Sequence, residues 1–355
     1  MKALVLSGGT GTRLRPLSYS MPKQLIPVAG KPVLEHVLGN IRQLGVEEVG
    51  IVVGESGPAI ADVIGDGGRL GLRVIYLEQD QPLGLAHCVR LARDFLGDED
   101  FVMYLGDNVL PDGIRDVAAD FRRRGPAAHV VLQKVADPRA FGVAELDTTG
   151  RVRRVVEKPQ QPPSDLALIG VYFFTAAIHR AAAAVRPSAR GELEITDAIQ
   201  WLISHDFEVR ASEYAGYWKD TGRIEDVLDC NRRLLGDLRR EVAGEVDAAS
   251  RLTGQVVICP GARVVRSRID GPAIIGAGTL VEESHVGPGT AVGRDCVLRD
   301  TRLEDSVVLD GATIAGLPGL HGSFVGRSAV VTPRRGENSC HRLIVGDHTR
   351  LEIAG

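Results

Sequence analysis

The chain has few lysines, few aromatic residues and no long apolar run. Its 42 basic residues are six lysines and 36 arginines, and the net charge is −4. With this charge balance we expect no extended positively charged surface that would bind nucleic acid or anionic lipid. The longest charge-free apolar run, 166–178, is too short to span a bilayer. The N-terminus also lacks the long apolar core of a secretory signal. We therefore expect no membrane partner and no nucleic-acid partner.

Cysteine is scarce as well, and no CxxC motif occurs. An odd number of widely spaced cysteines argues against a disulfide framework and against a zinc site, and indicates the reducing cytoplasm. The five residues are Cys88, Cys230, Cys259, Cys296 and Cys340.

What is present is typical of a globular protein, with 44% apolar and 25% charged residues in a length of 355 that suggests about two domains. Strand and helix patterns alternate at first, with strands expected at 2–7, 48–53, 73–77 and 101–105 and a helix at 33–44. Such alternation predicts an α/β fold, Rossmann-like, with a mainly parallel sheet. Ligands then bind beyond the carboxyl ends of the strands.

The pattern changes after residue 143. We expect strands at 143–146, 152–156 and 169–174, and helices at 176–185, 195–203 and 224–238. The first domain is assigned to 1–240, and the polar, alanine-rich segment 241–251 to a linker.

A 17-residue repeat follows the linker. Aliphatic residues spaced six, six and five apart, with glycines after them, predict a triangular parallel β-solenoid over 252–355. Its last part, from about Pro318, loses the period and is expected to form a cap. An antiparallel β domain with chance spacing is the weaker alternative. The aligned series are Leu252, Ile269, Val286 and Leu303; Ile258, Ile275, Val292 and Leu309; and Val264, Val281 and Leu298.

The strongest local signal is LSGGTGTRLRP at 6–16, followed by PKQLIPV at 22–28. Glycines after a strand allow backbone N–H groups to approach phosphate oxygens, and Arg13 and Lys23 add positive charge. A P-loop would need Gly-Lys-Ser/Thr at its end, and a Rossmann fingerprint would need a small residue where Leu14 stands. A turn-forming glycine loop with surface cations is the alternative.

The two motifs resemble the signature of sugar-1-phosphate nucleotidyltransferases. The tripeptide KQL at 23–25 is most similar to that of glucose-1-phosphate thymidylyltransferases. The resemblance extends through most of 1–230, and the solenoid is similar to the left-handed β-helix of longer members, common in actinobacterial antibiotic-sugar pathways. The further motifs are QDQPLGLA at 79–86, LGDN at 105–108, FGV at 141–143, EKP at 157–159, ARGELEITD at 189–197 and WKDTG at 218–222.

The resemblance implies that a sugar 1-phosphate attacks the α-phosphorus of a nucleoside triphosphate and releases pyrophosphate, here giving dTDP-glucose from dTTP and glucose 1-phosphate. The attacking phosphate is already an anion, so no general base or protein nucleophile is needed. Mg²⁺ is the implied cofactor, with Asp107 and Asp220 as its ligands. Taken alone, Asp107 suits a turn and Asp220 a helix cap.

The resemblance also assigns residues by role. The catalytic set is Arg13, Lys23, Asp107, Lys158 and Asp220. The nucleotide-binding set is Leu6, Gly8, Gly9, Gly11, Thr12, Arg13, Gln24, Gln79, Pro82, Gly84 and Asp107. The sugar-phosphate-binding set is Asn108, Gly142, Glu157, Lys158, Val171 and Arg190.

Three other functions are weighed against this one. UTP or another hexose 1-phosphate would keep the same chemistry, since thymine and uracil differ by one methyl. A non-catalytic nucleotide-sugar sensor is less expected, because both aspartates and all the phosphate cations are present. An acyltransferase activity of the solenoid has only His285 and His321 to support it. We read the solenoid as an assembly module that favours a homo-oligomer.

Overall fold

The computed structural model describes residues 1–9, 11–334, 343–347 and 350–354. It divides into two compact units, each described here by itself. Unit 1 comprises Met1–Gly9 and Leu34–Lys219, and unit 2 comprises Thr10–Val33 and Asp220–Gly355. Unit 2 therefore combines the glycine-rich signature loop with the C-terminal part of the chain.

Unit 1 is built on a nine-stranded sheet in the order β10-β9-β11-β6-β1-β4-β5, with β8 paired to β11 and β12. The run β5-β4-β1-β6 is parallel, whereas β11 is antiparallel to β6, β8 and β9. The predicted α/β architecture and strands are confirmed. The strands are β1 (Lys2–Leu6), β4 (Glu48–Val53), β5 (Arg73–Glu78), β6 (Phe101–Leu105), β8 (Ala128–Lys134), β9 (Gly142–Leu146), β10 (Val152–Glu157), β11 (Leu166–Phe174) and β12 (Val209–Glu213).

The register places the carboxyl ends of three strands side by side. Leu6 at the end of β1 pairs with Val52 of β4 on one side and Leu105 of β6 on the other. The loops that follow these strands, beginning at Ser7, Gly54 and Gly106, therefore start from the same edge of the sheet. This is the edge where ligands of parallel α/β sheets bind.

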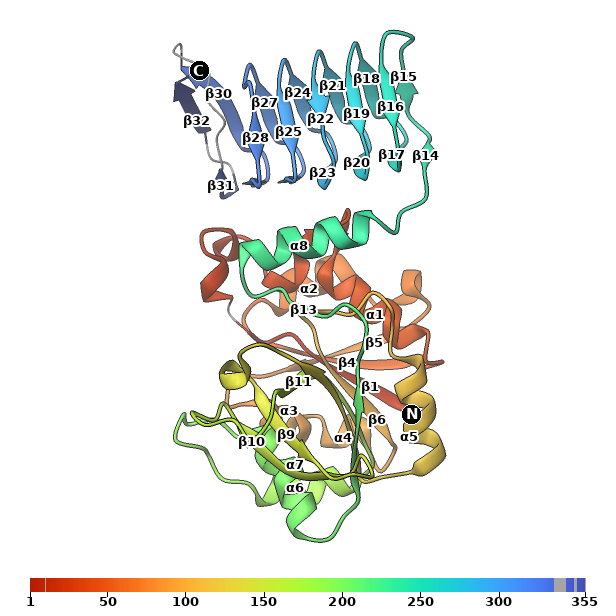
Figure 1. Ribbon diagram of the computed structural model, residues 1–355, viewed down its shortest axis with the longest axis vertical. Helices are drawn as coiled ribbons and strands as arrows, with labels where there is room; N and C mark the ends of the chain where they lie inside the picture. Colours follow the sequence, from red (N-terminus) through yellow and green to blue (C-terminus); the bar gives the residue numbers. More distant parts are fainter. Residues whose placement is uncertain (10, 335–342, 348–349, 355) are drawn as a thin grey trace. The chain divides into compact units, whose positions relative to one another are not determined.

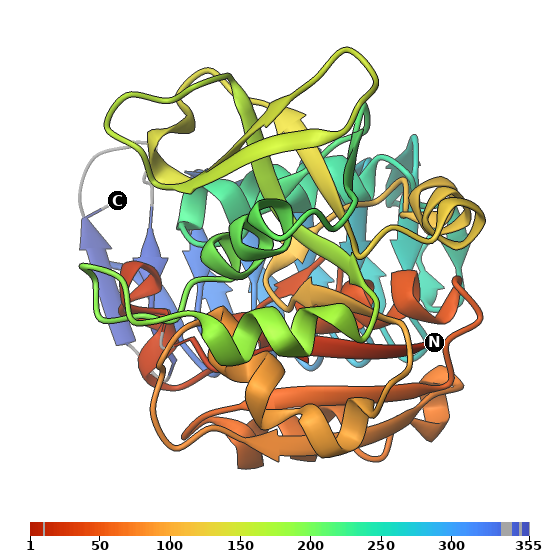
Figure 2. The same ribbon diagram turned by 90° about the horizontal axis from the view of Figure 1, so that it is seen from below.

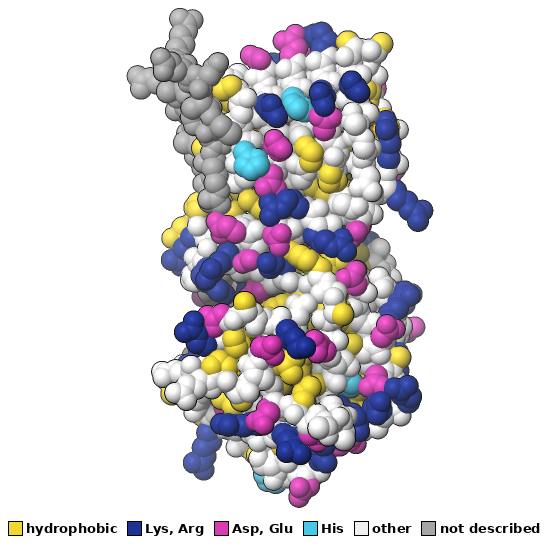
Figure 3. All heavy atoms as spheres, in the orientation of Figure 1, with side chains coloured by type: hydrophobic (Ala, Val, Ile, Leu, Met, Phe, Trp, Pro, Cys, Tyr) yellow, Lys and Arg dark blue, Asp and Glu magenta, His cyan; other side chains and the backbone are white. Residues whose placement is uncertain are grey.

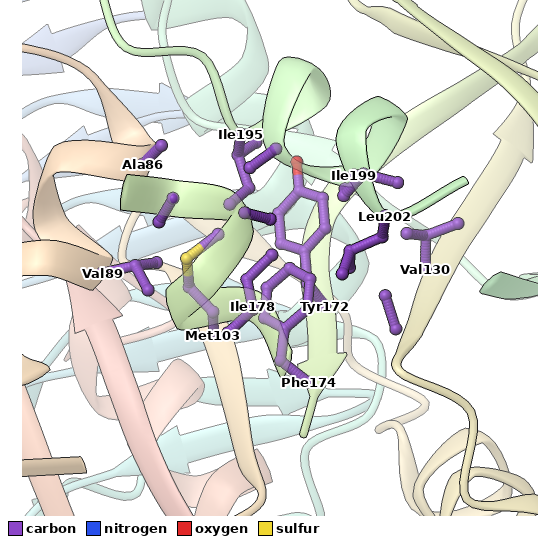
Figure 4. Close-up of a cluster of buried hydrophobic side chains, with 14 of the residues drawn as sticks. Ala86, Val89, Met103, Val130, Tyr172, Phe174, Ile178, Ile195, Ile199 and Leu202 are labelled. Atoms are coloured by element: carbon purple, nitrogen blue, oxygen red, sulfur yellow. The ribbon is translucent and has the colours of Figure 1, made fainter. Parts of the chain in front are cut away.

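Helices α3, α6 and α7 pack on one another, and a large apolar cluster joins them to the sheet (Figures 2 and 4). Tyr172 and Phe174 of β11 lie in this cluster with their rings stacked, and both are almost fully buried. The helices are α1 (Val33–Arg42), α2 (Gly57–Ile64), α3 (Leu85–Leu91), α4 (Arg93–Leu96), α5 (Arg115–Arg124), α6 (Ala177–Ala184) and α7 (Ile195–Ser204). Short elements are η4 (Gly68–Leu70), η5 (Pro138–Ala140), β7 (Asn108–Val109) and β13 (Lys219–Asp220).

In unit 2, short parallel strands stack into three sheets, as in left-handed β-helices (Figure 1). The first sheet holds β14 (Glu241–Val242), β17 (Val256–Ile258), β20 (Ala273–Ile275), β23 (Thr290–Val292), β26 (Val307–Val308), β29 (Phe324–Val325) and β31 (Ile344–Val345). The second holds β15 (Glu245–Val246), β18 (Arg263–Val265), β21 (Leu280–Glu282), β24 (Val297–Arg299), β27 (Thr313–Ala315), β30 (Val330–Arg334) and β32 (Arg350–Ala354). The third holds β16 (Arg251–Thr253), β19 (Arg268–Asp270), β22 (His285–Val286), β25 (Arg302–Glu304) and β28 (Leu320–His321).

The strand register confirms two of the three predicted series. Leu252 pairs through Ile269 and Val286 to Leu303, and Val264 pairs through Val281 to Leu298. In the remaining series Val292 pairs with Val308, so the alignment with Leu309 was wrong. The coil after β23 is one residue shorter than the 17-residue repeat, and both Val308 and Leu309 are buried there.

The segment 241–251, assigned above to a linker, contributes β14 and β15 to the solenoid. Ala243 N donates to Ile258 O at 2.8 Å and Glu245 N donates to Ala262 O at 2.8 Å. Because backbone groups make these bonds, polar side chains do not prevent the pairing. The strands also continue beyond Pro318, where the cap was expected, and β31 and β32 still pair within the solenoid sheets; residues 335–342, 348–349 and 355, including Cys340, lie outside the described residues.

The other elements of unit 2 are α8 (Ile224–Leu235), η1 (Thr12–Leu14), η2 (Leu17–Tyr19), η3 (Lys23–Leu25), β2 (Pro27–Val28) and β3 (Lys31–Pro32). None of the helices in the described residues has the length and hydropathy that a membrane crossing requires. On the face drawn in Figure 3, cationic and anionic side chains are interspersed rather than gathered by sign.

Candidate active site

The signature loop folds tightly around Gly11, whose φ of 62° lies in the left-handed region. A Cβ atom there would lie 3.2 Å from Ser18 Cβ and 3.3 Å from Lys23 Cβ. Ser18 Oγ donates to Gly11 O at 2.7 Å, and Leu14 N donates to the same oxygen at 2.9 Å. The two halves of the signature, 11–16 and 22–28, are therefore packed against each other. Thr10 lies outside the described residues.

The same loop brings Arg13 to Asp220, far away in the sequence. A Cβ atom at Gly222 would lie 3.1 Å from Arg13 Nη2 and 3.2 Å from Asp220 Oδ1. Thr12 and Arg13 are exposed, whereas Gln24 is buried and its Oε1 accepts no hydrogen bond within the described part of the chain. A guanidinium thus stands beside a carboxylate, next to an exposed turn.

In unit 1 the edge formed by β1 and β6 carries a second group. Gly106 N donates to Leu6 O at 2.9 Å, and a Cβ atom at Gly106 would lie 2.5 Å from Ser7 Oγ. Asp107 follows at 9% exposure, and Asn108 Nδ2 donates to its Oδ1 at 3.0 Å. Trp218 Nε1 in turn donates to Asn108 Oδ1 at 2.6 Å, which fixes the orientation of the amide.

Gln79 lies at the end of β5, beside the start of the glycine-rich motif. A Cβ atom at Gly8 would lie 3.1 Å from Gln79 Oε1, and Gly9 next to it is exposed. On its other side Gln79 Nε2 lies 2.9 Å from His87 Nδ1 and 3.4 Å from Cys88 Sγ. Burial raises the pKa of the Cys88 thiol to about 12, so the sulfur stays protonated and uncharged.

The loop after Gln79 is fastened to the segment before α7. Ala86 N donates to Leu193 O at 2.9 Å, and Leu193 N donates to Leu83 O at 2.7 Å. Gly84 lies between these bonds with a φ of 104°, while Pro82 is exposed. The 79–86 and 189–197 motifs are therefore joined by backbone pairing.

A third group gathers around Glu157 at the end of β10. Thr196 Oγ1 donates to Glu157 Oε2 at 3.1 Å, and a Cβ atom at Gly142 would lie 2.7 Å from Thr196 Cγ2 and 3.2 Å from Glu157 Oε2. A side chain at 142 would therefore displace the Thr196 methyl group. Lys158 follows with a φ of 40°, and its Nζ lies 3.7 Å from Glu157 Oε1.

Arg190 lies among three carboxylates. Its Nη1 lies 3.4 Å from Glu157 Oε1 and 3.1 Å from Glu194 Oε1, and its Nη2 lies 3.0 Å from Glu192 Oε1. Burial raises the pKa of the Glu194 carboxyl despite this cation. Arg190 and Lys158 both keep about 40% of their side chains exposed, so each can reach an anionic ligand.

Comparison with known proteins identifies the family of the chain. The family model described as nucleotidyl transferase matches residues 2–236. The chain belongs to the nucleotidyl transferase family.

Similar proteins extend over the solenoid as well. Glucose-1-phosphate thymidylyltransferases of Streptomyces griseus and Streptomyces antibioticus are 51% and 49% identical over 354 residues, covering 100% and 99% of both chains. A solved structure assigned as a glucose-1-phosphate thymidylyltransferase of Bacillus anthracis, in complex with sucrose, is 33% identical with a TM-score of 0.63. It covers 68% of this chain and 97% of that chain.

Nucleotidyl transferases are generally metal-dependent. Among the described residues no cluster of three or more His, Cys, Asp or Glu side chains is placed to hold one. The two predicted ligands, Asp107 and Asp220, are carboxylates on different units, and Asp220 stands beside Arg13. Oxygen ligands of this number fit Mg²⁺, which takes one or two carboxylates together with substrate phosphates and water.

Most predicted site residues thus lie in or beside a few groups: one around Arg13 and Asp220 in unit 2, and others around Asp107, Gln79 and Glu157 in unit 1. Val171 is fully buried in β11 and pairs with Tyr104, so its side chain is part of the core. Thr196, His87 and Trp218 were missed as site residues. Thr196 and Trp218 stand inside quoted motifs, which is the signal that could have found them; His87 follows directly after one.

Proposed function

We propose that the chain makes dTDP-glucose and pyrophosphate from dTTP and glucose 1-phosphate. The observation that carries the proposal is the 51% and 49% identity to glucose-1-phosphate thymidylyltransferases over the full length, solenoid included. The arrangement of unit 1 supports it, because the Gln79 amide and the group of Glu157, Lys158 and Arg190 offer the polar and cationic side chains that a base and a sugar phosphate would need.

The reaction forms one bond, from a phosphate oxygen of glucose 1-phosphate to the α-phosphorus of dTTP. It breaks the bond from that phosphorus to the bridging oxygen of the leaving pyrophosphate. The protein supplies position and charge, since the nucleophile is already an anion. In the proposal Leu6, Gly8, Gly9, Gly11 and Thr12 provide backbone contacts to the nucleotide.

Cations would neutralise the charge that develops on the phosphates. Arg13 holds the β- and γ-phosphates, and Lys23 stabilises the α-phosphate and the departing pyrophosphate. Gln24, buried beside Lys23, offers its amide to the nucleotide. Asp107 and Asp220 would hold Mg²⁺, which when bound withdraws electron density from the phosphate oxygens.

The base would be recognised by Gln79, with Pro82 and Gly84 shaping the loop around it. A side-chain amide both donates to and accepts from a pyrimidine edge. His87 accepts from Gln79 Nε2 at 2.9 Å, which leaves Oε1 toward Gly8 and the ligand. UTP presents the same edge without the methyl group, a difference of about 1–3 kcal/mol in an apolar pocket. It remains the second candidate nucleotide.

The sugar phosphate would lie against the Glu157 group. Glu157, Asn108 and the backbone at Gly142 and Val171 would accept from or donate to the sugar hydroxyls. Lys158 and Arg190 would bind the phosphate, Arg190 as a bidentate fork.

The experiment is a panel of dTTP, UTP, CTP, ATP and GTP against glucose 1-phosphate and other hexose 1-phosphates, with and without Mg²⁺, reading pyrophosphate release. We expect dTTP with glucose 1-phosphate to give the highest kcat/KM, and EDTA to abolish turnover. Preference for UTP in direct competition would establish the second candidate, and no release with any pair would overturn the proposal.

We further propose that 1–240 carries catalysis and that 252–355 is an assembly module. Stacked parallel coils end in unpaired strand edges, which favour self-association. Light scattering coupled to size exclusion should then give a mass that is a multiple of 38.0 kDa. A monomer at all concentrations would contradict this assignment.

A further inference from the structure

One polar side chain connects the signature loop with the solenoid inside unit 2. Asn231 of α8 is fully buried. Its Oδ1 accepts from Ala29 N at 2.9 Å, and its Nδ2 donates to Gly289 O at 2.8 Å. Ala29 ends the signature segment, and Gly289 lies in the turn before β23 of the solenoid. The amide oxygen of Asn231 thus binds the signature loop, and its amide nitrogen binds the solenoid.

Apolar contacts surround this bridge. Ala29, Leu235 of α8 and Ala291 of β23 form a buried cluster against which Ile274 of β20 packs. A Cβ atom at Gly30 would lie only 3.1 Å from Ile274 Cδ1. The loop therefore rests directly on the outer face of the solenoid.

The segment that connects this contact to Lys23 is short and tightly packed. Between them run η3 and β2, and Gln24, Leu25 and Ile26 are all buried. Val33 N closes the segment by donating to Ile26 O at 3.1 Å. Because the connection is short and packed, a shift at Ala29 is transmitted to Lys23.

We propose that Asn231 is a positioning residue: it seats the Lys23 segment on the solenoid, so that the solenoid supports the phosphate-binding loop. This rests on the proposed function, in which Lys23 stabilises charge in the transition state. A misplacement of about 1 Å can cost on the order of a hundredfold in rate.

The test uses the full chain and two variants on opposite sides of the contact. Asn231→Leu removes both hydrogen bonds at similar volume, and Ile274→Ala removes the apolar support while leaving the amide in place. We expect kcat for pyrophosphate release to fall about tenfold or more in Asn231→Leu and by less in Ile274→Ala. The KM for glucose 1-phosphate should stay within about twofold in both, because that substrate is bound by residues of other elements.

Matched controls lie on the same elements. Arg232→Gln breaks the ion pair from α8 to Asp305 of the solenoid, 2.6 Å long, and leaves the Ala29 bond intact. Val257→Ala truncates the residue that pairs with Ile274 one coil earlier. Both controls should keep a wild-type kcat. If the controls lose as much activity as Asn231→Leu, or if Asn231→Leu lowers thermal stability with an unchanged kcat, the positioning role is overturned.

Hydrogen exchange provides a readout that does not depend on activity. Peptides covering 24–33 should exchange faster in Asn231→Leu than in the wild type, because the Ala29 N–H loses its acceptor. Unchanged exchange would overturn the bridge itself. A wild type that exchanges as expected but releases no pyrophosphate would instead overturn the proposed function, so the two failures are distinguishable.

Discussion

Replacing Gly84 with alanine tests whether the loop proposed to read the base and the segment proposed to bind the sugar phosphate work as one unit. Gly84 has φ 104° and ψ 170°, a backbone conformation that is essentially restricted to glycine. A Cβ atom there would lie 2.5 Å from Leu193 O and 2.7 Å from Leu193 N. These are backbone atoms, so no side-chain rotation relieves the clash.

The size of the effect follows from two parts. The backbone conformation costs about 1–3 kcal/mol for a residue with a Cβ atom. Moving the loop away from Leu193 also breaks two hydrogen bonds, each contributing about 0.5–1.5 kcal/mol. The strain and the clash with Leu193 destabilise the seated loop, whereas these two hydrogen bonds oppose its release; a net cost of about 1–3 kcal/mol lowers the population of the seated loop by up to about a hundredfold.

Steady-state kinetics measure this population if, as proposed, Gln79 and Arg190 bind the two substrates, because only the seated loop holds both segments in place. We expect the KM for dTTP and the KM for glucose 1-phosphate to rise together, each about tenfold. Gly65→Ala is the control, with φ 66° and ψ −146° and open space around the added Cβ. It carries backbone strain without the clash. Equal kinetics in the two variants, or a rise in one KM alone, would refute the coupling.

Three further results are expected. Asp107→Asn should lower kcat by at least about a hundredfold through loss of a metal ligand, whereas the exposed Asp98→Asn should not; calorimetry should show both folded, and near-normal turnover of the first would refute its role. Lys158→Ala should raise the KM for glucose 1-phosphate and not that for dTTP, with the exposed Lys134→Ala as control; a shift in both would contradict a sugar-phosphate role. Burial lowers the pKa of His129 from 6.5 to about 4, so its contribution to stability is present above pH 6.5 and is lost as pH falls toward 4, at most about 3 kcal/mol. Unfolding followed by tryptophan fluorescence, at pH 7 and 4.5, should show a smaller loss in His129→Asn, and equal losses would refute the assignment.

The sequence predicts the sheet of unit 1 well, because its signals are local. The central strands are buried on both faces, so β1 and β6 read as continuous apolar runs and their bounds follow directly. The solenoid is visible for a related reason: one inward aliphatic per six residues is a periodic signal. It misleads only where a coil drops a residue, as between Val292 and Val308.

Pairing made by backbone groups leaves no such signal. The first coil, β14 and β15, has polar residues that the sequence assigns to a linker, although its N–H groups bond the next coil. The joining of Leu83 to Leu193 is likewise made only by main-chain atoms. Asn231 is a different case, since it interrupts an apolar stripe of α8 between Val227 and Leu235 at helical spacing. A buried amide at such a position indicates a polar partner, and the sequence does not say which.

An amide at this point does something that an apolar residue would not do. Contacts among Ala29, Leu235 and Ala291 bury surface but tolerate sliding, because dispersion and the hydrophobic effect have little directionality. Asn231 adds one donor and one acceptor with fixed separation, and each must meet its own partner or be left buried and unsatisfied at a cost of about 1–3 kcal/mol. Because the amide is held on α8, sliding the loop along the solenoid breaks at least one of the two bonds. The bridge therefore selects one register of the loop, which is what Lys23 would need in order to stabilise charge on a phosphate as proposed.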